Sequence, residues 1–193
     1  MARPRAFAED EVVDAAVERF WRHGYAATSV RDLGEAMGLG QASFYNAFGT
    51  KQALFARALD RYLDNNMRER IIRLEASLPP RRAIEAFLEE IVERSLGDPD
   101  RCGCLLVNTA LEMAPQDPQV AAVVAARLRQ LEAFFRRCTT AAQRAGTVPQ
   151  NLKAADVARL MLSTVMGLRV LARVRPERAL LEGILSQALA ALD

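Results

Sequence analysis

Residues 29–51 read SVRDLGEAMGLGQASFYNAFGTK, and the architecture expected for the whole chain follows from this stretch. Val30, Leu33 and Met37 recur at i, i+3 and i+7, which is the spacing of one helical face. Gly38 can adopt the positive φ of a tight turn, so the chain can reverse direction there. The pattern predicts two short helices joined by a glycine turn, with a long helix beginning near residue 51.

The ends of these helices are predicted from residues that favour helix caps. The hydroxyl of Thr28 is expected to accept a hydrogen bond from the first turn of the first helix. Gly40 is expected to start the second helix, residues 41–47, and Thr50 to cap the long helix that follows. Local chemistry therefore bounds both short helices.

Two short helices with a glycine turn have the shape of a helix-turn-helix, whose second helix can enter a DNA major groove. The exposed residues expected on the second helix suit that role. Gln41, Ser43 and Asn46 can hydrogen-bond base edges, and Tyr45 and Lys51 can reach phosphates. An ordinary helical hairpin with a polar outer face fits the same spacing, so the spacing alone leaves both interpretations open.

Residues 28–55, TSVRDLGEAMGLGQASFYNAFGTKQALF, resemble the DNA-binding signature of the TetR family of bacterial repressors. The resemblance lies in the opening threonine, the turn at residues 36–39, the F-Y-x-x-F of residues 44–48 and the G-T-K-x-x-L-F of residues 49–55. It lies within roughly the first quarter of the chain. Many members carry histidine where this chain has Asn46 and Ala47, so the family's operator preferences are not transferred.

The resemblance implies an all-α fold with two domains. Residues 1–50 would form a helix-turn-helix DNA-binding domain, and residues 51–193 a helical domain for effector binding and dimerisation. The implied partners are a palindromic double-stranded DNA operator, a second copy of the chain and a small-molecule effector. The residues expected at the DNA are Thr28, Ser29, Arg31, Gln41, Ala42, Ser43, Tyr45, Asn46 and Lys51.

Length and composition favour the same fold class. The 193 residues are 51% hydrophobic, rich in alanine and leucine, and without strand-like alternation, which favours an all-helical protein. No stretch reaches the roughly 18 uncharged apolar residues of a membrane span. The N-terminus lacks the apolar segment of a signal peptide. A cytoplasmic protein without membrane contact is therefore expected.

The net charge does not by itself indicate a DNA-binding protein. It is +2 for the chain, and residues 1–51 hold six Lys/Arg against seven Asp/Glu. Charge that faces DNA must therefore come from arrangement, with Arg3, Arg5, Arg31 and Lys51 on one surface. Residues 1–8 are expected to form a mobile arm, which either lies in a minor groove or is a disordered tail.

Further helices are expected at residues 10–23, 51–75, 82–96, 102–113, 118–145 and 154–174, with Pro176 in the first turn of a last helix. The helix at 154–174 is apolar on two sides, so one side can cover its own core while the other needs a partner. These last two helices are expected to form the dimer interface, although they can instead simply cover the monomer core. The expected interface residues are Leu160, Thr164, Leu168, Leu171, Leu181, Ile184, Leu185 and Ala188.

Catalysis is not expected. A single histidine leaves no His/Cys metal cluster and no Ser/His/Asp triad, and there is no phosphate-binding glycine loop, so neither a metal nor a cofactor is predicted. By resemblance, an effector pocket is expected among the helices of residues 51–145. Most of its candidate residues are more typical of plain core. They are Tyr62, Met67, Phe87, Ile91, Cys104, Leu105, Asn108, Thr109, Glu112, Phe134 and Met161.

The three cysteines, Cys102, Cys104 and Cys138, do not suggest a disulfide framework, because their number is odd and the expected location is cytosolic. The segment after Arg101 resembles the opening of this helix in a branch of the family that senses electrophiles and oxidants. Cys104 would lie in the first helical turn beside Arg101, and both features lower the pKa of a thiol. The alternative is a small buried hydrophobic residue.

The function expected is therefore a DNA-binding transcriptional regulator, a repressor released from its operator by a small molecule. Three alternatives stay open at the level of sequence. They are a ligand-independent architectural DNA-binding protein, a redox or electrophile sensor acting through Cys104, and a small-molecule-binding or catalytic helical protein.

Overall fold

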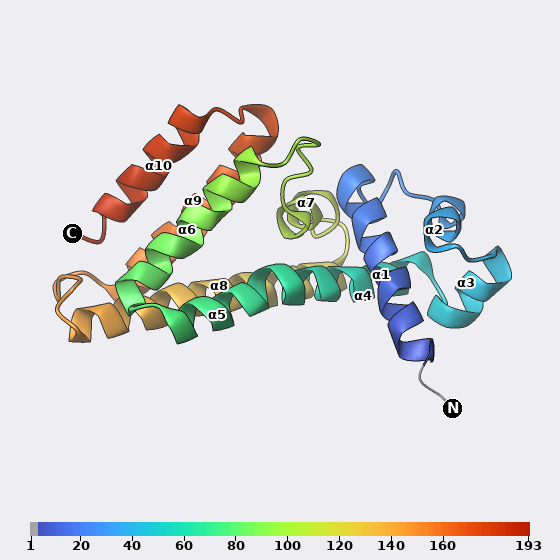
Figure 1. Cartoon of the computed structure of the whole chain (residues 1–193), viewed down its shortest axis with the longest axis horizontal. Coiled ribbons are helices and arrows are strands. Elements are labelled where there is room, and N and C mark those ends of the chain that lie inside the picture. Colours follow the sequence, from blue (N-terminus) through green and yellow to red (C-terminus); the bar gives the residue numbers. More distant parts are fainter. Residues whose placement is uncertain (1–3) are drawn as a thin grey trace. The chain divides into compact units, whose positions relative to one another are not determined.

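The structure, a computed structural model, describes the backbone of residues 4–193 and the side chains from Glu9 onward. The described part is all-helical, which confirms the predicted fold class (Figure 1). No helix within it is long and apolar enough to cross a membrane. In chain order the elements are α1 (Pro4–His23), α2 (Val30–Met37), α3 (Gln41–Phe48), α4 (Lys51–Leu63), the π-helical segment η1 (Asp64–Arg68), α5 (Glu69–Ser77), α6 (Pro80–Leu96), α7 (Leu105–Glu112), α8 (Pro118–Arg144), α9 (Ala154–Val174) and α10 (Arg178–Ala190).

Two helix ends differ from the prediction near the N-terminus. Helix α1 begins at Pro4 rather than at residue 10, so residues 4–8 are helical where an arm was expected. The rest of that expected arm, with Arg3, lies outside the described residues, and so does the side chain of Arg5. The N-cap of α2 is Ser29 and not Thr28, because the Ser29 hydroxyl accepts the hydrogen bond from the Asp32 amide at 3.1 Å.

Two further corrections concern the second half of the chain. Helix α7 begins at Leu105 and not at residue 102, because Arg101 (φ 51) and Gly103 (φ 72) adopt left-handed conformations that cannot continue a helix. Helix α10 begins at Arg178 with Glu177 as its N-cap. Pro176 therefore precedes this helix instead of occupying its first turn.

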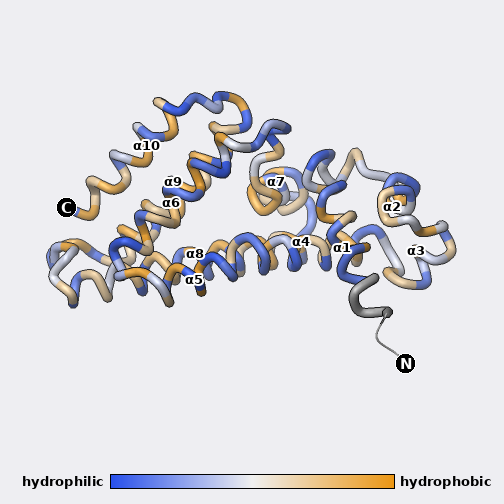
Figure 2. The backbone as a smooth tube through the Cα atoms, in the orientation of Figure 1, coloured by the Kyte–Doolittle hydropathy of each residue, from blue (hydrophilic) through white to orange (hydrophobic). Residues whose placement is uncertain are grey.

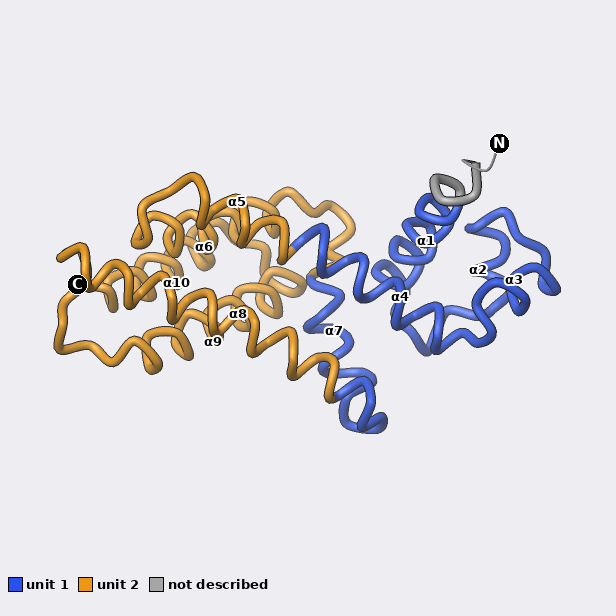
Figure 3. The backbone as a smooth tube through the Cα atoms, turned by 90° about the horizontal axis from the view of Figure 1, so that it is seen from below, with its two compact units in different colours: residues 1–66, 104–121 blue, residues 67–103, 122–193 orange. Residues whose placement is uncertain are grey.

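The chain divides into two compact units (Figure 3). The first unit comprises residues 1–66 and 104–121, and the second comprises residues 67–103 and 122–193. The first boundary falls inside η1, a π-helical turn in what the sequence predicts as one continuous helix over residues 51–75. The predicted functional domains, 1–50 and 51–193, stay a prediction beside this structural division.

In the first unit, α1 packs against α4 and α2. Phe20 on α1 is fully buried and meets Phe55 on α4 edge to face, with ring centroids 5.0 Å apart. At the solvent edge of the same helix pair, Arg61 on α4 forms ion pairs with Asp14 and, at 3.1 Å, with Asp10 on α1. An apolar centre and charged edges thus hold the helix that supports α2 and α3.

The second unit contains one hydrophobic core, to which α5, α6, α8, α9 and α10 contribute. Phe87 on α6 lies 5.3 Å from Phe134 on α8, centroid to centroid. Arg70 on α5 is buried, and its Nε lies 3.1 Å from a carboxylate oxygen of Glu90 on α6. Apolar positions also recur along α9 and α10, which pack against each other (Figure 2).

Candidate nucleic-acid interface

Helix α3 presents nearly all of its side chains to solvent. Its backbone starts after Gly40 and ends at Gly49. Phe44 and Phe48 are the buried residues of this helix, and their ring centroids lie 5.8 Å apart. They hold one face of α3 against the rest of the first unit. The residues that remain exposed include all those predicted for DNA on this helix, which are Gln41, Ala42, Ser43, Tyr45 and Asn46.

The turn before α3 is built as the sequence predicts. Gly38 has φ 65, in the left-handed region, and the Leu39 amide donates to the Gly34 carbonyl at 2.8 Å. At the other end of α2, Ser29 and Asp32 form a capping box, because the Ser29 amide also donates to the Asp32 carboxylate at 2.8 Å. These bonds from the Ser29 amide and hydroxyl lower the pKa of Asp32. Helices α2 and α3 therefore form a helix-turn-helix.

A groove of about 680 Å³ runs along this motif. It joins the exposed edge of α2 to the first residue of α3, so Arg31, Glu35 and Gln41 line the same depression. Arg31 and Glu35 are both highly exposed, and the Arg31 Nε donates to Glu35 at 2.9 Å. Polar and charged groups thus surround the end of α3 that, in such motifs, contacts base edges.

Lys51, the first residue of α4, does not extend freely into solvent. Its Nζ lies 4.1 Å from the centroid of the Tyr25 ring, the geometry of a cation–π contact. Burial, and to a lesser degree the charge of Asp117, raises the pKa of the Tyr25 phenol. The positive charge of Lys51 is therefore held beside the turn between α1 and α2. Tyr45 on α3 is 47% exposed and is available for contacts outside the chain.

Thr28 is predicted at the DNA from the sequence, but the structure does not leave it accessible there. Its side chain is fully buried, and its hydroxyl donates to the Gly24 carbonyl at 2.7 Å. A side chain without accessible surface cannot contact a duplex, so Thr28 instead shapes the turn between α1 and α2.

Glu112, expected at an effector pocket, lies against this same turn. Its carboxylate accepts hydrogen bonds from the backbone amides of Ala26, at 2.7 Å, and Tyr25, at 3.3 Å. Gly24 has φ 79, and a Cβ at this position would lie 3.1 Å from the same carboxylate. The last residue of α7 therefore satisfies two donors of the turn that leads into the helix-turn-helix, a contact that sequence periodicity could not indicate.

We expect Glu112→Ala to lower the free energy of unfolding of the first unit by about 1–3 kcal/mol, because two amides lose a charged acceptor. Trp21, the single tryptophan of the chain, lies on α1 with its ring 5.3 Å from that of Tyr62, so its fluorescence follows this unit during urea unfolding. Gln116→Ala, an exposed change nearby, serves as the control. Equal midpoints for both variants would contradict a stabilising role for Glu112.

Residues 1–51 contain more acidic than basic side chains, and most of these acids have cationic partners within the fold. Asp10 and Asp14 pair with Arg61, and Asp32 pairs with Arg19 at 3.3 Å in addition to its capping role. These carboxylates lie on α1 or at the start of α2. These three of the seven carboxylates of residues 1–51 are thus paired within the first unit, whereas Glu35 stays on the exposed edge of α2.

The residues predicted for an effector pocket are divided between the two units. Met67, Phe87, Ile91, Phe134 and Met161 belong to the core of the second unit and are buried. Tyr62, Leu105 and Thr109 are buried in the first unit, where Asn108 is half-buried. Met67 also borders a groove of about 440 Å³ between α5 and α8. Arg68, Arg127 and Arg137 line the same groove, and Glu75 faces Arg137 at 2.9 Å.

The cysteine environments differ from one another. Cys104 is half-buried and is the N-cap of α7, in extended conformation, so it does not lie in the first helical turn as expected. The Arg101 carbonyl beside it accepts a hydrogen bond from the Arg173 Nε at 3.2 Å. Cys102 and Cys138 are buried, and burial, with a smaller effect from Glu75, raises the pKa of the Cys138 thiol to about 12.

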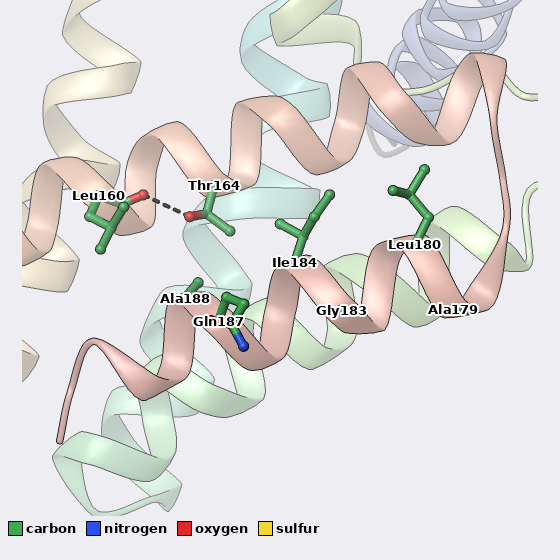
Figure 4. Close-up of a pocket in the computed structure, with 8 residues that line it drawn as sticks. All are labelled: Leu160, Thr164, Ala179, Leu180, Gly183, Ile184, Gln187 and Ala188. Atoms are coloured by element: carbon green, nitrogen blue, oxygen red, sulfur yellow. Dashed lines mark hydrogen bonds between the residues drawn. The ribbon is translucent and has the colours of Figure 1, made fainter.

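Helices α9 and α10 border an open apolar groove of about 570 Å³ (Figure 4). Leu180 and Ile184 of α10 extend toward α9, where the Thr164 hydroxyl donates to the Leu160 carbonyl at 2.9 Å. Four of the predicted interface residues line this groove, with four others that the prediction omitted. The full lining is Leu160, Thr164, Ala179, Leu180, Gly183, Ile184, Gln187 and Ala188.

Two other predicted interface residues require a correction. Leu168 and Leu181 have 0% exposed surface and belong to the core of their own chain. They lie on the faces of α9 and α10 that pack into the core, so they cannot present surface to a second subunit. Leu171 and Leu185 are half-buried beside the same core.

Comparison with known proteins identifies the family. Residues 12–58 match the family model described as bacterial regulatory proteins of the tetR family. Residues 80–188 match a tetracyclin repressor-like C-terminal domain. The uncharacterised helix-turn-helix regulator YezE of Bacillus subtilis (strain 168) is 30% identical over the full length of both chains. The repressor ComR of Escherichia coli (strain K12) is 28% identical, with 89% of this chain and 82% of ComR covered.

Solved structures agree with these sequence relatives. A cysteine mutant of the TetR family regulator CifR, complexed with 26-bp double-strand operator DNA, matches with a TM-score of 0.85 and 30% identity, over 100% of both chains. A TetR regulator from Chloroflexus aurantiacus matches with a TM-score of 0.85 and 26% identity, over 96% of this chain and 93% of its own. The chain thus belongs to the TetR family and is a helix-turn-helix DNA-binding transcriptional regulator of the TetR type.

Proposed function

We propose that the protein is a homodimeric repressor that binds a palindromic operator and leaves it when a small-molecule effector binds. The observation that supports this most is the exposed polar face of α3 in a helix-turn-helix. A CifR mutant with 30% identity over its full length has been solved with operator DNA. In such dimers the two recognition helices read half-sites about 34–36 Å apart, or a multiple of that distance.

The contacts proposed for DNA follow from exposure and side-chain chemistry. Gln41, Ser43 and Asn46 are exposed on α3 and carry the donors and acceptors that read base edges in the major groove. Tyr45 and Lys51 are proposed for phosphates, which fix the position of the protein without reading sequence. Lys51 already lies beside the Tyr25 ring, which limits the side-chain freedom that it would lose on binding.

The dimer interface is proposed at the groove between α9 and α10. Its lining is largely apolar, and Leu160 is 42% exposed there, so a single subunit leaves apolar surface in water that a second copy would cover. Ala179, Gly183 and Ala188 have small side chains, which allow two helix pairs to approach closely.

The effector site is proposed in the second unit, around Met67, Phe87 and Phe134. These flexible or aromatic side chains adapt to apolar ligands. The groove beside Met67, with its three arginines, suits an effector that also carries an anionic group. Binding would act by favouring one of two pre-existing conformations of the dimer.

Substitution of Lys51 tests the proposed DNA binding. An operator is first selected from random duplex DNA with the wild-type protein, and a palindrome is expected. Lys51→Ala should then weaken binding to operator and unrelated duplex alike, and should reduce the slope of log K against log salt by about 0.9 for each phosphate that the lysine neutralises. Lys153, the other lysine of the chain, lies at the N-cap of α9, so Lys153→Ala is the matched control. Salt-independent binding by the wild type would contradict the proposed function.

A further inference from the structure

The pair formed by Arg31 and Glu35 is the most exposed ion pair on the helix-turn-helix. The two side chains are 88% and 65% exposed, and the Arg31 Nε donates to Glu35 at 2.9 Å. This hydrogen bond and the charge of Glu35 raise the pKa of Arg31, with a smaller contribution from Asp32. Since both residues lie on one face of α2, the carboxylate occupies the donor face of the guanidinium.

The position of this pair places it where DNA is expected. Arg31 and Glu35 share their groove with Gln41, the first residue of α3. In a helix-turn-helix the N-terminal residues of the second helix contact base edges, while the first helix crosses the phosphate backbone. An arginine on the exposed edge of α2 is therefore suited to a phosphate oxygen, and a carboxylate on the same edge repels that oxygen.

The partners of Glu35 distinguish it from the neighbouring acids. Asp32 accepts from the Ser29 amide and lies 3.3 Å from Arg19 on α1, so its negative charge is bound into the fold. Asp14 is paired with Arg61 between α1 and α4. Glu35 instead holds an exposed arginine of its own helix, and this contact links no two elements. A role in fold stability does not explain this ion pair, because exposed pairs contribute little to the free energy of unfolding.

We infer that Glu35 is an internal competitor of the DNA phosphate for Arg31. In the free protein the Glu35 carboxylate accepts from the guanidinium. On the duplex, a phosphate oxygen takes its place, and Glu35 is left close to the negatively charged backbone. The inference rests on the proposed function and deepens it. Because Glu35 competes, phosphate contacts contribute less to the affinity, and a larger share of the binding free energy comes from the base contacts of α3. A smaller loss of binding free energy is then enough to release the operator.

Glu35→Gln tests this exchange with the full-length protein. It keeps the shape of the side chain and removes its charge. The variant should bind both the selected operator and an unrelated duplex about three- to tenfold more tightly at low salt, because phosphate contacts carry no sequence information. The slope of log K against log salt should steepen by up to about one unit per subunit. Unchanged melting temperature would show that the fold is intact.

Two comparisons make the result specific. Glu18 and Arg22 form an ion pair with the same i,i+4 spacing on α1, and their side chains are 50% and 46% exposed, so Glu18→Gln is the matched control and should leave DNA binding unchanged. In an Arg31→Ala background, Glu35→Gln should give a clearly smaller gain, because the competed group is absent and only the direct repulsion between Glu35 and the phosphate is relieved. If Glu35→Gln raises the affinity by the same factor with and without Arg31, simple repulsion between Glu35 and the phosphate explains the gain, and the inference is overturned.

Other outcomes are equally decisive. Weaker operator binding by Glu35→Gln would mean that Glu35 contacts a base, and unchanged binding would mean that the pair has no role at DNA; either overturns the inference and leaves the proposed function standing. Failure of the wild type to bind any duplex would overturn both.

Discussion

Replacement of Leu160 by glutamate is expected to leave a folded subunit that no longer dimerises and that binds its operator at least roughly 100-fold more weakly, which corresponds to about 2.8 kcal/mol. Leu160 borders the groove between α9 and α10 and is 42% exposed in the single chain, so a charge there is tolerated by the monomer. In a dry interface the same charge would lose its hydration, at a cost of several kcal/mol. A monomer binds one half-site and loses the gain from joining two.

Two further substitutions on α9 separate loss of the dimer from loss of the fold. Leu168 is completely buried in the same chain, so Leu168→Glu should unfold the second unit. Val174 is 74% exposed and does not line the groove, so Val174→Glu should change neither property. Sedimentation equilibrium reports the oligomeric state, and circular dichroism reports the helices. A dimeric Leu160→Glu protein would remove this groove as the interface.

The second large effect is expected from Gln41→Ala. Gln41 is exposed at the start of α3, the part of a recognition helix that contacts base edges, and a glutamine side chain pairs with adenine through two hydrogen bonds. Loss of such a contact costs about 1–3 kcal/mol per site. Two subunits on a palindrome would double this cost to at least about 2 kcal/mol, so operator affinity should fall at least about 30-fold, while affinity for unrelated duplex should stay the same.

A repeated selection from random duplex DNA measures the effect. The Gln41→Ala protein should accept any base at one symmetric pair of positions, with an unchanged salt slope. Gln119, exposed near the start of α8 in the same unit, provides a control of identical chemistry, and Gln119→Ala should keep the wild-type operator. If Gln41→Ala retains the full preference at every position, Ser43 or Asn46 must carry the base readout instead.

Features that depend on neighbours in sequence were predictable. The bounds of α9 and the end of α2 agree with the prediction because periodicity and turn residues are local, and Gly38 adopts the left-handed turn that its position suggested. The choice between adjacent capping residues was less certain. Ser29 caps α2, whereas Thr28 is directed inward by its bond to the Gly24 carbonyl.

Features that depend on distant contacts were not predictable. Both apolar sides of α9 read alike in sequence, so nothing local distinguished the buried Leu168 from the exposed Leu160. The partner of Glu112 is a turn 86 residues away, and a carboxylate that accepts from backbone amides leaves no pattern in side-chain type. The residues of α3 that read bases could not be predicted individually either. Their exposure follows from the fold, but which of them contacts a base depends on the DNA.

The discontinuous make-up of the first unit has a consequence for how the protein is made. Ribosomal synthesis supplies residues 1–66 first, but α7 and Glu112 follow only after residues 67–103, which belong to the other unit. At bacterial elongation rates of about 5–20 residues per second, the turn between α1 and α2 waits for its acceptor on the order of seconds. The first unit therefore cannot be completed before residues 67–103 of the second unit have been translated. A nascent chain stalled in between lacks the acceptor that the turn before the helix-turn-helix requires.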